Sequence, residues 1–193
     1  MEKIKVIKCE NDNGLSAVFT YDHDVTEFFL VSLDGVYRMK NAVHTSQNAT
    51  TDGSSYGGET LEQRNIVITA NIRRNYRENR DHLSRVFKKG AEGTFYHTED
   101  GQTRKIKYRV EDIDIAEKGV LRPAVISLIC PDPYFKDDTA THIEMASWES
   151  GFEFPCEIQE SGMEFGTRSK ETIKVVDNNS TTAIGIQMTI IAE

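Results

Sequence analysis

The sequence is poor in cysteine, proline and tryptophan, with three, four and one among 193 residues. Cys9, Cys130 and Cys156 are far apart, so no CxxC spacing exists that could form a structural zinc site or a redox pair. The five histidines are equally dispersed, and no HExxH motif occurs. We therefore expect reduced, mostly buried thiols, and no metal or cofactor.

Long apolar runs are also missing. No stretch of about 18 apolar residues is present, which excludes a membrane-spanning helix. The first 14 residues alternate charged with apolar side chains and lack the continuous apolar centre of a signal peptide. We therefore expect no membrane insertion and no secretion by a signal peptide.

The acidic residues are unevenly placed along the chain. Residues 1–130 carry 19 Lys and Arg against 19 Asp and Glu, whereas residues 131–193 carry 4 against 12, so the second part holds the whole net charge of -8. The step coincides with two prolines that stiffen the backbone and extend the residue before each. We predict a first domain at 1–135, a linker at 136–147 and a second domain at 148–193. The interdomain corner comprises Cys130, Pro131, Asp132, Pro133, Tyr134 and Phe135.

Alternating apolar residues predict a mainly β (α+β) protein. Strands are expected within 14–22, 27–35, 64–72 and 120–130, where Pro123 indicates a strand start or an edge. On the first of these, Leu15, Ala17, Phe19 and Tyr21 are expected to share one face. Residues 94–116 read as a hairpin with Asp100 and Gly101 at its tip. The apolar parity changes along its second strand, which predicts a one-residue bulge near Glu111 and Asp112.

One helix is predicted between residues 75 and 90, where the apolar period changes to that of a helix. Asn75 and Glu78 have the spacing of a capping box, and Gly90 supplies a stop signal. The expected buried face contains Tyr76, Leu83, Val86 and Phe87. The surrounding arginines and lysines are interpreted as a solvated face, since no nucleic-acid motif accompanies them.

Residues 41–63 are polar and glycine-rich, and they are longer than an ordinary connection of about 4 to 6 residues. Two interpretations remain open. The segment is either a linker or disordered arm, or a loop or hairpin that leaves the domain to contact a partner.

Four stretches follow one another along the chain: TDGSSYGGETLEQRNIVITANI, the helix ENRDHLSRVFKKG, the hairpin after it, and ISLICPDPYF. Their order and spacing resemble the distal tail protein family of long-tailed, non-contractile phages and their prophages. In that family a strand ends in a similar proline corner. A second domain then opens with an apolar strand similar to residues 152–155.

This resemblance implies a structural role without catalysis. The expected fold is an amino-terminal β-sandwich with one helix and a protruding hairpin arm, followed by an incomplete galectin-like β-sandwich, because residues 148–193 are few for a complete one. Six copies would form a hub ring in the virion tail, between the tail tube and the tail-tip or receptor-binding proteins, and DNA would pass through it without specific binding. The candidate subunit-contact residues are Tyr56, Gly57, Gly58, Arg64, Asp100 and Gly101.

Two rival functions are weighed against this one. A carbohydrate-binding β-sandwich module would use Trp148, but one tryptophan is a small sugar platform. An enzyme would use Cys130 as nucleophile and a histidine such as His142 as base. A cysteine at the end of an apolar strand is expected to be buried and inert, which disfavours the enzyme.

Overall fold

The computed structural model describes residues 5–138, except 23, 25, 26, 48, 49, 51, 118 and 120, together with the strands at 148–150 and 166–168. The chain divides into two compact units, residues 1–139 and 140–193. In the second unit β11 (Trp148–Ser150) pairs antiparallel with β12 (Gly166–Arg168). The predicted galectin-like sandwich and the side chain of Trp148 lie outside what the structure describes.

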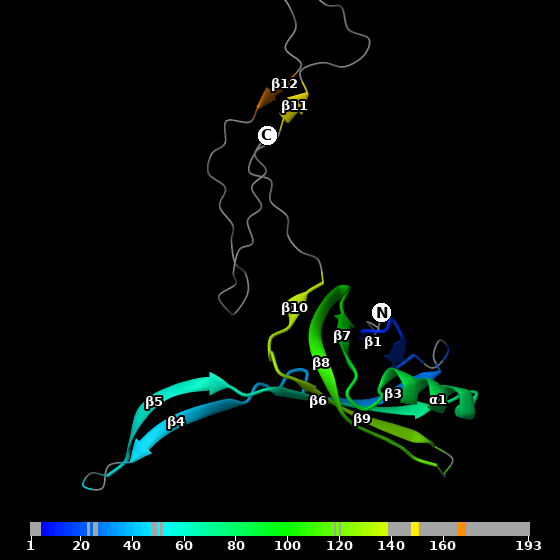
Figure 1. Ribbon diagram of the computed structural model, residues 1–193, viewed down its shortest axis with the longest axis horizontal. Coiled ribbons are helices and arrows are strands. Elements are labelled where there is room, and N and C mark those ends of the chain that lie inside the picture. The colour runs from blue at the N-terminus through cyan, green and yellow to red at the C-terminus, as the bar shows by residue number, and fades with distance from the viewer. Residues whose placement is uncertain are drawn as a thin grey trace, which may run out of the picture. The chain divides into compact units, whose positions relative to one another are not determined.

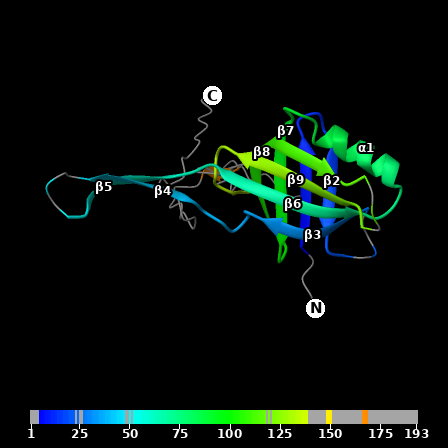
Figure 2. The same cartoon turned by 90° about the horizontal axis from the view of Figure 1, so that it is seen from below.

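The first unit is built on a closed sheet, seen in Figures 1 and 2. Its strand order is β10-β8-β7-β1-β2-β3-β6-β9, and β8 also pairs with β9, which closes the sheet. The prediction of an amino-terminal sandwich is therefore corrected to a barrel-like sheet. The strands are β1 (Val6–Asn11), β2 (Ser16–Thr20), β3 (Phe28–Asp34), β6 (Arg64–Ile72), β7 (Glu92–Glu99), β8 (Gln102–Ile115), β9 (Pro123–Cys130) and β10 (Lys136–Asp137). Lys136 and Asp137, expected in the linker, pair with β8 as part of this unit.

The barrel closes through β8, which is long enough to serve two neighbours. Its first half pairs with β7 and its second half with β9. The register with β9 shifts between Val110 and Asp112, so the predicted bulge is confirmed. At the β7–β8 turn, Asp100 and Gly101 both have positive φ, 57° and 81°, as a two-residue hairpin turn of the favoured type requires.

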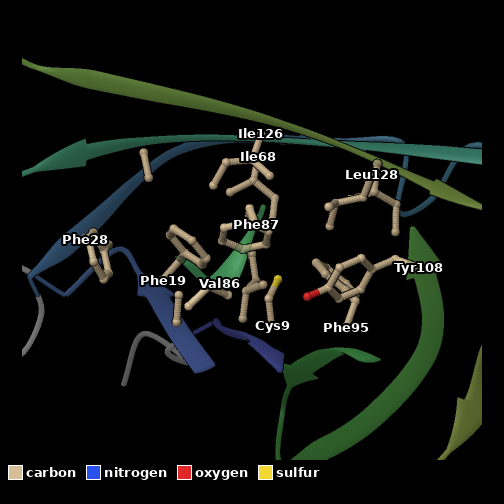
Figure 3. Close-up of a cluster of buried hydrophobic side chains, with 14 of the residues drawn as sticks. Cys9, Phe19, Phe28, Ile68, Val86, Phe87, Phe95, Tyr108, Ile126 and Leu128 are labelled. Atoms are coloured by element: carbon tan, nitrogen blue, oxygen red, sulfur yellow. The ribbon is translucent and has the colours of Figure 1, made fainter. Parts of the chain in front are cut away.

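The barrel interior is filled by alternate strand residues, as Figure 3 shows. Phe19 lies between Phe28 and Phe87, with ring centroids 5.6 and 6.3 Å apart, and Phe87 also contacts Tyr108. Ile68, Phe95, Ile126 and Leu128 complete this part of the core. On β2, Ala17 and Phe19 are buried as predicted, whereas Leu15 and Tyr21 lie just beyond the strand ends and are exposed.

The helix α1 (Tyr76–Val86) packs its predicted apolar face, with Leu83 and Val86 buried. The predicted capping box is wrong, because Asn75 has a left-handed backbone and its side chain makes no cap hydrogen bond. At the other end, the Asn11 amide of β1 donates to the carbonyl oxygen of Val86 at 3.1 Å. The helix therefore ends against β1, a strand that was not predicted from the sequence.

Two further strands form a hairpin arm that extends from the barrel (Figures 1 and 2). Its strands, β4 (Asn41–Gln47) and β5 (Ser54–Leu61), pair with each other and with no other strand of the described chain. The structure shows a hairpin for this polar segment, and its contact with a partner stays a prediction.

Candidate functional site

One face of the arm carries two exposed apolar side chains, Val43 and Tyr56, beside the polar Thr45 and Glu59. Val43 pairs with Glu59, and Thr45 pairs with Tyr56, so these residues lie on the same side of the hairpin. Val43 is 55% exposed and Tyr56 65% exposed. The opposite face carries small and polar side chains, including Ala42 and Thr60. The backbone groups at the outer edges of the two strands and these two apolar side chains are features on which another polypeptide can pack.

Gly57 and Gly58 create a bulge in this arm. The register shifts between His44 and Thr45, so β5 carries one extra residue. Gly58 has a φ of 124°, which favours glycine, and a Cβ on Gly57 would lie 3.2 Å from the His44 carbonyl oxygen. The two candidate contact glycines therefore shape the arm rather than offering side chains for contact.

The arm root, residues 35–40, joins β3 to the arm and borders a groove of about 490 Å³. Lys40, which precedes β4, and Glu62, which follows β5, form an ion pair of 2.7 Å. Met39 lines the groove and is 61% exposed. Arg64 also lines it, yet only 5% of this residue is exposed. Its guanidinium contacts backbone carbonyls of its own chain, so this predicted contact residue faces inward.

A second, smaller pocket of about 230 Å³ brings together the β7–β8 tip, the arm root and the corner. Asp100, Tyr37 and Phe135 line it. The Tyr37 hydroxyl donates to the Glu99 carboxylate, and the Lys5 ammonium pairs with the same carboxylate at 2.7 Å. His97 is buried here, and burial lowers its pKa. Of the predicted contact residues only Asp100 lines this pocket, whereas Tyr56, Gly57 and Gly58 lie on the arm.

The corner is folded against the barrel. Phe135 packs on the core residue Phe95, with ring centroids 6.3 Å apart. The Asp132 carboxylate accepts a hydrogen bond from the Tyr134 amide at 3.2 Å and pairs with Lys136. Cys130, the last residue of β9, is fully buried.

Burial raises the pKa of Cys130 to about 12, and the smaller opposing effect of Arg64 does not compensate. A thiol in this state is almost entirely protonated near neutral pH and is a poor nucleophile. His142, the base of the enzyme alternative, lies outside the described residues. Within those residues, no group of three or more His, Cys, Asp and Glu side chains is placed to hold a metal ion.

Alkylation tests this inert state of Cys130. In native protein at pH 7.5, we expect iodoacetamide to modify Cys130 at least about a hundredfold more slowly than in urea-unfolded protein, because burial withholds both the thiolate and access. Peptide mass spectrometry would measure the rate at Cys130 separately from the other cysteines. Rapid native labelling at Cys130 would contradict the buried thiol described here.

A family model matches the sequence of this chain. This model, described as the phage tail protein RIFT-related domain, matches residues 21–130, which is more than half of the chain. The chain belongs to this family. The match runs from the end of β2 to the end of β9 and includes the arm, Arg64 and Cys130. The resemblance to phage tail proteins seen in the sequence is thereby confirmed.

A solved structure has a similar fold. The crystal structure of the SPP1 Dit protein (gp 19.1), described as a paradigm of the hub adsorption apparatus in phages that infect Gram-positive bacteria, has a TM-score of 0.53. The aligned region covers 75% of this chain and 56% of the Dit chain, at 14% sequence identity, and this similarity supports the fold.

Two structures of the phage P2 baseplate in its activated conformation, with Ca and with Sr, have TM-scores of 0.46 and 0.45 at 12% and 13% identity. They cover 90% and 93% of this chain and 63% and 59% of theirs. The chain therefore spans less than two thirds of the length of each of the three structures. No curated protein matches it in sequence.

Sequence reasoning did not assign Arg64 its inward position or give Tyr37 any role. For Arg64 a signal was present, because it shares the parity of Ile66, Ile68 and Ala70, which are buried on β6. For Tyr37 there was none, since its partners are distant in sequence: Lys5 precedes β1, and Glu99 ends β7.

The described helix is too short and too polar to cross a membrane.

Proposed function

We propose that this protein is a structural component of a phage tail tip, in which six copies form a hub ring between the tail tube and the adhesion apparatus. The ring would sit in the virion tail, contact the tube and the tail-tip or receptor-binding proteins, and leave a passage for DNA without binding it specifically. Membership of the phage tail family and the fold shared with a hub protein support this role.

The arm is the observation that carries the proposal. β4 and β5 each have one strand neighbour among the described residues, so each keeps an edge on which a further strand can pair. One face of the arm presents the apolar side chains of Val43 and Tyr56 to solvent. An arm whose strands pair with no other strand of the described chain gains stability by packing on a neighbouring copy. Repeated head-to-tail contacts of this kind close into a ring when the rotation between copies returns to the first copy.

The proposal is tested by the mass and shape of the purified protein. We expect analytical ultracentrifugation to detect a species of six copies as concentration rises, and negative-stain images to show sixfold rings. The Val43→Ser, Tyr56→Ser double variant should weaken this assembly by at least about tenfold, because it removes two apolar anchors from the contact.

The control is Ala42→Ser with Thr60→Ser, which alters the opposite face of the same two strands. It should assemble like the wild type. Equal assembly of both double variants would show that the face with Val43 and Tyr56 is not the contact. A wild-type protein that stays monomeric at every concentration would count against the self-assembled ring.

A further inference from the structure

Arg64 is a buried cation whose partners are backbone carbonyl oxygens. Nη1 lies 2.9, 2.6 and 2.8 Å from the carbonyl oxygens of Gly35, Val36 and Arg38. Nε donates to the Pro133 carbonyl oxygen at 3.0 Å. Among the described residues no carboxylate lies within ion-pair distance of this guanidinium. Its charge is therefore compensated by peptide dipoles.

Such an arrangement is stable only if the carbonyls stay in place. A buried charge without a counter-ion is costly unless its hydrogen-bonding groups are satisfied. Burial lowers the pKa of Arg64, yet arginine remains charged in proteins. The planar guanidinium can direct donors to several acceptors at once, which the point charge of lysine cannot reproduce.

The four carbonyls belong to two segments far apart in the sequence. Gly35, Val36 and Arg38 lie in the arm root, and Pro133 lies in the corner from which the chain continues toward the second unit. Residues 35–40 of the arm root and residues 131–135 of the corner lie outside the strands. The ring of Phe135 also lies 5.2 Å from the Arg64 guanidinium carbon. One side chain thus joins two irregular segments.

Gly35 allows this approach. Its φ is 87°, and a Cβ placed on it would lie 1.9 Å from the Asn65 carbonyl oxygen. Only glycine permits the backbone to run so close to β6 in this conformation. The close approach brings the Gly35 carbonyl to the guanidinium of the residue next to Asn65.

We propose that Arg64 is a positioning residue that sets the direction of the arm relative to the barrel and ties the arm root to the corner. The use of this direction in assembly rests on the ring function proposed above, whereas the tie itself is a property of the single chain. A displacement of the corner would be transmitted to the arm through this guanidinium, and the reverse would hold.

Hydrogen exchange in the full-length protein tests the tie. In Arg64→Lys we expect faster exchange, by at least about tenfold, at one hydrogen-bonded amide of each segment, because one ammonium cannot serve both segments. The amide of Glu62 donates to the Lys40 carbonyl oxygen of the arm root, and the amide of Tyr134 donates to the Asp132 carboxylate of the corner. Arg64→Met, which removes the charge, should accelerate both segments at least as much. Amides of the β7–β8 hairpin should keep their wild-type protection and thus report that the barrel is folded.

Arg109→Lys is the matched control, because Arg109 is exposed and pairs with Glu92 on the barrel surface. It should leave both segments unchanged. The proposal is overturned if Arg64→Lys keeps wild-type protection in both segments, or if only one segment loosens. Should Arg64→Met fail to fold, Arg64→Lys still decides between these outcomes.

The two proposals fail in different ways. If the wild type forms no ring but both segments loosen in Arg64→Lys, the tie stands and the ring function falls. If the ring forms and depends on Val43 and Tyr56, while the exchange of Arg64→Lys matches the wild type, only the role of Arg64 falls.

Discussion

Replacing Gly93 by alanine is expected to separate β7 from β1. A Cβ at this position would lie 2.2 Å from the Glu10 carbonyl oxygen, which is backbone of the neighbouring strand and cannot rotate away. It would also lie 2.7 Å from the Tyr108 hydroxyl. We expect a loss of about 3 kcal/mol or more in the free energy of unfolding, at the upper end for an overpacked core. Urea denaturation followed by circular dichroism would measure it.

Two variants separate the clash from other causes. Gly90→Ala is the same substitution at a position where the new methyl group would meet open space. The positive φ of Gly90, 78°, should lower the free energy of unfolding by only about 1–2 kcal/mol. Adding Tyr108→Phe to Gly93→Ala should not restore stability, because the Glu10 carbonyl remains. If Gly93→Ala were no less stable than Gly90→Ala, the close pairing of β1 and β7 would be wrong.

Phe87→Ala is expected to destabilise the first unit by about 3–5 kcal/mol, the usual cost of deleting a buried aromatic ring. Phe87 follows α1 directly, is fully buried and contacts both Phe19 and Tyr108, so its loss leaves a cavity between the helix and the barrel. Because domains are stable by only about 5–15 kcal/mol, thermal unfolding should move down by about 10 °C or more.

Tyr56→Ala is the aromatic control for this experiment. Its ring is 65% exposed on the arm, and its removal should change the free energy of unfolding by no more than about 0.5 kcal/mol. A Phe87→Ala protein as stable as Tyr56→Ala would mean that the helix is not anchored in the core through this ring.

Local patterns in the sequence were sufficient for the elements whose cause is local. The β7–β8 turn follows from an Asp-Gly pair, and the bulge after Val110 follows from a change of apolar parity. The buried face of the helix follows from its period. The first strand was missed because Lys8 and Glu10 dominate its outer face, while only Ile7, Cys9 and Asn11 face the interior.

Properties that depend on distant partners could not be read in the same way. A two-sheet sandwich and a closed barrel have the same alternation of apolar and polar residues along each strand. They differ here in the pairing of β8, which in the barrel pairs with both β7 and β9. The role of Arg64 depends likewise on carbonyls of the arm root and of the corner. Asn75 has a favourable capping residue type, but its backbone conformation overrides that preference.

The pairing of β1 with β7 has a consequence for synthesis on the ribosome. Cys9 lies opposite Phe95, so β1 gains its second neighbour only after the arm, β6 and the helix have been translated. Contacts so distant in sequence fold slowly, on a scale of about milliseconds to seconds, whereas the β4–β5 hairpin needs only neighbouring residues. Pairing of β4 with β5 can therefore begin before β1 has gained its second neighbour and the barrel has closed.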